Sequence, residues 1–223
     1  ADQAGELNRA GEDLIAKLGV RFNASHGLAK LAWTLARAPE RFERAARIVH
    51  AADFIAARLT GRYDTTDWTT ALRTGYDPVE GCWPVFLAHA LQIPREKLPR
   101  VTRPGEPVGP ADAEGARETG LTPATTVFAG MTEDCASQLA AGAFAPGAAC
   151  ATLGPQTVLK AVARELVRDP RARVGSCPHP ESGLWLPRGV TQSGRAALER
   201  EFGRDRLFLL DERVGPRLPT RGL

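Results

Sequence analysis

Apolar residues recur at helical spacing through the first part of the chain. A first amphipathic helix is expected over residues 2–18, followed by two helical segments separated at Pro39 and a third from about residue 50 to 59, closed by Gly61. The first helix places one apolar side inward, formed by Leu7, Leu14, Ile15 and Leu18. The next segment predicts a core face formed by Leu28, Leu31, Trp33 and Leu35.

The pattern changes towards strands after residue 124. A short buried strand is expected over Val127 to Ala129, then a glycine turn at Gly130 and a helix rich in small residues. Beyond Pro146, the stretches ACATLG and QTVLKAVA predict two paired strands around Gly154. We therefore place a domain boundary there, with one domain over residues 1–146 and a second over residues 147–223.

Composition adds the broad class of protein. The chain has 223 residues, is 43% hydrophobic and 25% charged, and carries 29 basic and 26 acidic residues for a net charge of +3. These charges are interleaved and the balance is small, so we predict no nucleic-acid or membrane partner. No apolar run is long enough to span a bilayer, and residues 1–14 lack the layout of a signal peptide, so we expect a cytoplasmic protein.

Cysteines and histidines do not suggest a metal site. The four cysteines share no C-x-x-C spacing, and the four histidines stand alone in the sequence. We predict reduced, mostly buried thiols, no disulfide framework and no bound metal at these residues. The cysteines are Cys82, Cys135, Cys150 and Cys177.

Adjacent acids at the start of the small-residue helix are the first candidates for chemistry. Glu133 and Asp134 open this helix after Thr132, and one interpretation is that Thr132 caps the helix while the two acids complement its positive end. A similar choice exists at Asp67, which is placed either to accept hydrogen bonds from a ligand or to cap a helix starting at Trp68.

Several segments resemble the FGGY family of carbohydrate kinases. TTVFAGMTEDCASQLAAG resembles the family segment in which a strand ending in Gly-Thr-Thr-Asp-Gly or Gly-x-Gly-Asp-Asn leads into an alanine-rich helix. TTDWTTALRTGYD is similar to a segment of D-ribulose kinases, a group often labelled as xylulose kinases, and HPESGLWLP resembles the opening of the family's second domain. The resemblance implies an incomplete α/β fold of the actin-like ATPase (ribonuclease H-like) type, with the helix-rich latter part of the first, sugar-binding domain and the opening strands of the second, nucleotide-binding domain.

The resemblance also implies site residues. The family's general base falls on Glu133, with Asp134 as the alternative, and Asp67 and Trp68 become candidate sugar contacts. The turn that meets the ATP phosphates falls on Gly154, Pro155 and Gln156, where the family has hydroxyl residues at the last two positions. Because proline lacks an N–H, we expect this turn to hold ATP poorly.

The implied activity is ATP- and Mg²⁺-dependent phosphorylation of a ketopentose, D-ribulose or D-xylulose. No Asp-x-Gly-Thr phosphate loop occurs in these 223 residues, so we expect the chain alone to be inactive. The alternative is a non-catalytic relative or remnant that binds sugar or a partner without turnover. A homodimer is one assembly that we consider for either case.

Overall fold

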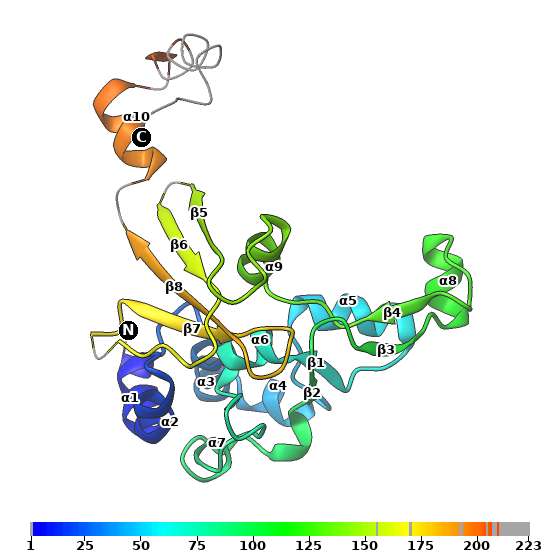
Figure 1. Ribbon diagram of the computed structural model, residues 1–223. Coiled ribbons are helices and arrows are strands. Elements are labelled where there is room, and N and C mark those ends of the chain that lie inside the picture. Colours follow the sequence, from blue (N-terminus) through cyan, green and yellow to red (C-terminus); the bar gives the residue numbers. More distant parts are fainter. Residues whose placement is uncertain are drawn as a thin grey trace.

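The structure is a computed structural model that describes residues 2–154, 156–169, 171–191, 194–203, 205–206 and 209. Short helices and turns form the first part of the chain (Figure 1). The helices are α1 (Asp2–Ala10), α2 (Glu12–Leu18), α3 (Gly27–Arg37), α4 (Pro39–Arg44), α5 (Ala51–Thr60), α6 (Trp68–Ala71), α7 (Phe86–His89), α8 (Ala113–Thr119), α9 (Glu133–Ala140) and α10 (Arg195–Phe202), with 3₁₀ turns η1 (Leu72–Thr74) and η2 (Arg95–Lys97).

Three small sheets accompany these helices. Strand β1 (Thr65–Asp67) pairs in parallel with β2 (Arg100–Thr102), and β3 (Pro107–Pro110) pairs antiparallel with β4 (Thr126–Phe128). The third sheet is antiparallel with the order β5-β6-β8-β7. Its strands are β5 (Ala149–Leu153), β6 (Thr157–Ala161), β7 (Val174–Pro178) and β8 (Trp185–Thr191), so the hairpin expected around Gly154 is confirmed.

Glycine and aspartate determine several helix ends. The single helix expected over residues 2–18 is wrong, because Gly11 separates α1 from α2 and a Cβ at this position would lie 3.2 Å from Phe86 Cζ. Gly61 closes α5 in the left-handed conformation at φ 69°. Asp112 caps α8 by accepting a hydrogen bond from the N–H of Gly115 at 2.7 Å.

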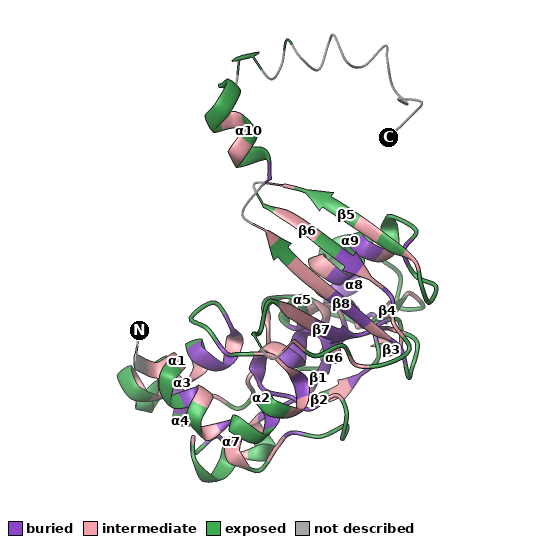
Figure 2. Ribbon diagram, turned by 60° about the vertical axis from the view of Figure 1, so that its left-hand side comes forward, coloured by how far each residue is buried: buried purple, intermediate pink, exposed green. Residues whose placement is uncertain are grey.

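The main core lies where the early helices meet α6 and the strands β7 and β8. Figure 2 shows the buried residues concentrated there, while β5 and α10 are largely exposed and β6 is mostly half-buried. Leu7, Leu14, Leu18 and Leu28 are buried as expected. Trp33 was expected in the core but is 54% exposed, because this side of α3 faces an open groove rather than another helix.

Strand β4 corrects a second expectation. It forms where a strand was expected, but Thr126 and Phe128 are exposed and only Val127 is half-buried. Phe128 is 56% exposed. The apolar run predicted a buried strand, whereas β4 pairs with β3 and both of its faces keep contact with solvent.

Candidate active site at the start of helix α9

Helix α9 begins beside α6, and a hydrogen bond between Thr132 and Thr69 joins them. The backbone N–H of Thr132 donates to Thr69 Oγ1 at 2.9 Å, and Thr69 Oγ1 donates to Asp67 Oδ1 at 2.5 Å. Asp67, Thr69 and the first turn of α9 therefore form one connected unit. Thr132 occupies the N-cap position, but its side chain makes no capping hydrogen bond, and its buried Oγ1 has no hydrogen-bond partner among the described residues. The expected capping role of the Thr132 hydroxyl is wrong.

Asp134 is engaged by two cations from the four-stranded sheet. Its Oδ1 lies 3.0 Å from Lys160 Nζ on β6, and its Oδ2 accepts a hydrogen bond from Arg188 on β8. Burial raises the pKa of the Asp134 carboxyl, but the hydrogen bond from Lys160 and the charges of Arg188 and Lys160 outweigh it, so the net pKa is lowered. Asp134 is thus held ionised and tied to the sheet.

Lys160 is the residue that sequence reasoning missed. Its side chain is only 2% exposed, and besides the carboxylate its Nζ bonds Asp134 O at 2.7 Å and Ser137 Oγ at 2.8 Å. Gln138 adds a further link between α9 and β6, since its Nε2 donates to Ala161 O at 2.9 Å. A lysine inside the apolar run QTVLKAVA was the available signal, because a buried ammonium requires partners.

Glu133 has the opposite environment. It is exposed in the first turn of α9, and the described residues offer it neither an ion pair nor a hydrogen bond. Of the two adjacent acids, Glu133 is therefore the one whose carboxylate is available to an incoming molecule.

Asp67 caps α6, as the second interpretation of its sequence position stated. Asp67 is 4% exposed, and its Oδ1 accepts from the N–H groups of Thr69 and Thr70 at 2.8 and 3.1 Å. Trp68 is half-buried against the core, and its Nε1 is buried without a partner. A sugar contact by Asp67 or Trp68 stays a prediction.

The turn between β5 and β6 is a poor fit for a nucleotide phosphate. The N–H of Gly154 is already donated to Gln156 O at 3.0 Å, and Gly154 O accepts from the N–H of Arg195 at 2.8 Å. Pro155 lies outside the described residues, and a proline has no N–H in any conformation. The described atoms of this turn therefore do not offer the row of free donors that would hold the phosphates of ATP.

Two further features of the described residues concern metal ligands and the state of the cysteines. No group of three or more His, Cys, Asp or Glu side chains in the described ranges could hold a metal ion, and Mg²⁺ has no carboxylate cluster there. All four cysteines are free. Cys135 and Cys177 are buried as expected, whereas Cys82 is exposed. None of the helices in the described ranges has the length and apolar character to cross a bilayer.

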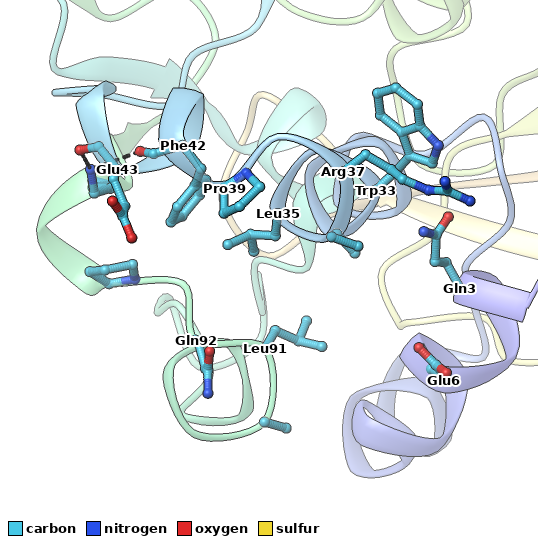
Figure 3. Close-up of a pocket in the computed structure, with 15 residues that line it drawn as sticks. Gln3, Glu6, Trp33, Leu35, Arg37, Pro39, Phe42, Glu43, Leu91 and Gln92 are labelled. Carbon is cyan, nitrogen blue, oxygen red and sulfur yellow. Dashed lines mark hydrogen bonds between the residues drawn. The ribbon is translucent and has the colours of Figure 1, made fainter.

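A larger groove lies away from this site, on the helical side of the molecule. It measures about 1030 Å³ and is lined from α1, α3, α4 and the segment after α7 (Figure 3). Leu35 and Leu91 line its middle, Trp33 lies towards the end near α1, and Glu6, Arg37 and Glu43 are among its polar residues. It includes none of the predicted site residues, so its size does not make it the candidate site.

Comparison with known proteins supplies the family. The N-terminal domain model of the FGGY family of carbohydrate kinases matches residues 3–140. Among curated relatives, the chain is 27% identical over 194 residues to a ribulokinase of Shouchella clausii (strain KSM-K16) and 23% identical over 181 residues to a xylulose kinase of Bacillus subtilis (strain 168). These alignments cover 82% and 77% of this chain but 34% of each relative. The chain therefore spans about a third of the length of the relatives it matches.

The structural comparison agrees with the sequence comparison. The crystal structure of a xylulose kinase from Rhodospirillum rubrum superposes with a TM-score of 0.83 at 25% identity, covering 99% of this chain and 46% of that one. The expected α/β class, a partial fold of the actin-like ATPase type found in FGGY sugar kinases, is confirmed. The domain boundary at residue 146 stays a prediction. On the family match over residues 3–140 and on this fold, the chain belongs to the FGGY family of carbohydrate kinases.

Proposed function

We propose that this chain forms the sugar-side part of a cytoplasmic FGGY carbohydrate kinase that phosphorylates a ketopentose, D-ribulose or D-xylulose, with ATP and Mg²⁺. The observation that carries the proposal is Glu133, an exposed carboxylate at the start of α9 that has no partner among the described residues and lies inside the segment matched to the family. The ribulokinase and xylulose kinase relatives support the choice of sugar.

In this proposal, Glu133 accepts the proton of the sugar hydroxyl that becomes phosphorylated. Asp134 has a different role: its ion pairs with Lys160 and Arg188 fix α9 against the sheet and so position Glu133. Asp67 acts at one remove, by orienting Thr69, whose hydroxyl receives the N–H of Thr132. No phosphoryl-transfer step is assigned to the turn at Gly154 and Gln156.

A first experiment is to read the DNA on both sides of the coding segment and assay the product of the whole reading frame for sugar-dependent ADP release. Replacing Glu133 with Gln removes the base, so we expect kcat to fall by about 10²–10⁴. Glu133→Asp shortens the side chain by one methylene and is expected to cost about 100-fold or less. Full activity of E133Q would reject Glu133 as the base.

A non-catalytic relative is the second candidate, favoured by the turn at Gly154, whose N–H is already used, and by the proline that follows it. Such a protein would bind the ketopentose without turnover. Saturable binding of D-ribulose or D-xylulose, measured by calorimetry together with no ADP release from the whole reading frame, would support it. Turnover by the whole reading frame would exclude it.

A further inference from the structure

A second cavity, of about 460 Å³, lies between the loop joining α2 to α3, the turn η1 and the strands β7 and β8. Its lining is strongly basic: no aspartate or glutamate of the described residues contributes to it. The basic side chains come from three separate parts of the chain and are Arg21, Arg73, Arg173 and Arg188.

Only two of these four charges are balanced by carboxylates in the described part of the chain. Arg173 pairs with Asp169 at 2.9 Å, and Arg188 pairs with Asp134. Arg21 and Arg73 have no carboxylate partner among the residues that the structure describes. Because Asp134 also pairs with Lys160, at least two positive charges of the cavity are unbalanced among the described residues. A half-buried guanidinium such as Arg73 favours an anion beside it.

His26 positions one of these arginines. It lines the same cavity and is 5% exposed, and Arg73 Nη1 donates to its Nε2 at 3.0 Å. Since a guanidinium can only donate, Nε2 is the acceptor and the ring proton sits on Nδ1. Burial, with the charges of Arg73 and Arg188, lowers the pKa of His26 to about 4, so the ring is neutral near pH 7. Nδ1 is buried and has no hydrogen-bond partner in the part of the chain that the structure describes.

We propose that this cavity binds the oxyanion group, phosphate or carboxylate, of a small organic molecule, with the guanidinium groups of Arg73 and Arg21 as donors and His26 positioning Arg73. Donors arriving from several sides match an acceptor-rich anion. The volume exceeds that of a bare ion, and Val20, Leu72 and Val190 add apolar lining for a short carbon skeleton.

Calorimetric titration of the 223-residue chain tests the site without ATP or turnover, so the result does not depend on the proposed kinase activity. The probes are D-glucose 6-phosphate, D-gluconate and neutral D-glucose, at one ionic strength fixed with NaCl. We expect saturable binding of at least one of the two anions and much weaker binding of D-glucose, and comparison of the two anions identifies the preferred group. Equal binding of all three probes, or no binding by either anion, would overturn the proposal.

Variants locate the binding. Arg73→Gln should weaken anion binding about tenfold or more, since it removes a charged donor. Arg21 is exposed, so the fold should tolerate Arg21→Gln easily. This substitution should weaken anion binding about threefold. Arg117→Gln, on exposed α8, is the matched control with the same charge change. Bound anion should also shift the NMR signal of the His26 Nδ1–H proton. If R73Q and R21Q both bind like R117Q, the site is not in this cavity.

Discussion

Two neighbouring carboxylates at the start of α9 differ in what they contact. Their replacement is therefore expected to change the free energy of unfolding by different amounts. Asp134→Asn removes the counter-charge of Lys160, whose side chain is 2% exposed, and leaves that ammonium with only neutral acceptors. Because Asp134 is itself 27% exposed, we expect a loss of about 2–3 kcal/mol in the free energy of unfolding. Urea denaturation measures it.

Glu133→Gln is the matched control for that change. Its carboxylate is exposed and has no partner in the described ranges, so the free energy of unfolding should stay within about 0.5 kcal/mol of the original value. Equal destabilisation by E133Q and D134N would contradict the division of roles between the two acids.

His26 makes stability depend on pH. Its pKa is about 4 in the folded chain against 6.5 in the unfolded chain, so the unfolded state binds more protons between these values. The contribution of neutral His26 to the free energy of unfolding is therefore fully present above pH 6.5. It is lost as the pH falls towards 4, and the total loss is about 3 kcal/mol. Urea denaturation at several pH values in this window should show a shallower pH dependence for His26→Gln. The exposed His89→Gln is the control, and an unchanged slope in H26Q would exclude His26 as the cause.

At the scale of elements, helices α5 and α8 contact through a glycine. A Cβ on Gly115 would lie 2.6 Å from Leu59 O and 2.8 Å from Leu59 Cα, which are backbone atoms that cannot rotate away. At a helix position with free space around it, Gly→Ala stabilises the fold by about 0.5–1 kcal/mol. The sign of the stability change at Gly115 therefore shows whether the contact with Leu59 is tight. We expect Gly115→Ala to lower stability by about 1–3 kcal/mol. Gly130→Ala meets nothing within 4 Å and should be nearly neutral. A more stable G115A would show that α8 shifts freely against α5.

Local sequence patterns predicted an element well where the residues of that element alone determine its structure. The strand-like stretches around Gly154 indicated the β5–β6 hairpin, and the aspartate before Trp68 indicated the cap at Asp67. Burial was predicted less well, because it depends on which neighbour covers a face. Trp33 has helical spacing with core residues yet borders the groove, and Phe128 belongs to an apolar run yet is exposed.

The candidate site shows the same limit. The acids of α9 could be named from the sequence, but the partners that distinguish Asp134 from Glu133 lie 26 and 54 residues further along the chain. The cavity around His26 likewise combines a loop, a turn and two strands that no local pattern connects. Pro155 lies outside the described residues, so the nucleotide turn stays a prediction.

For the whole molecule, the four-stranded sheet has one face joined to α9 and another that is left open to solvent. Strand alternation places Lys160 towards α9 and Leu159 on the opposite face, where Leu159 faces Ala151 of β5 in the register. Leu153 shares that face. Leu153 is 77% exposed and Leu159 is 57% exposed. Contiguous exposed apolar surface promotes association.

We therefore expect the 223-residue chain to self-associate as its concentration rises, with sedimentation velocity as the measurement. Leu153→Lys combined with Leu159→Lys should reduce this association, because two charges on the sheet face oppose its burial against another apolar surface. The matched control is Val85→Lys, which adds a charge at a valine that is 73% exposed in the helical part of the molecule. A chain that stays monomeric at high concentration, or that V85K disperses as well as the double variant does, would show that the open face of this sheet does not drive association.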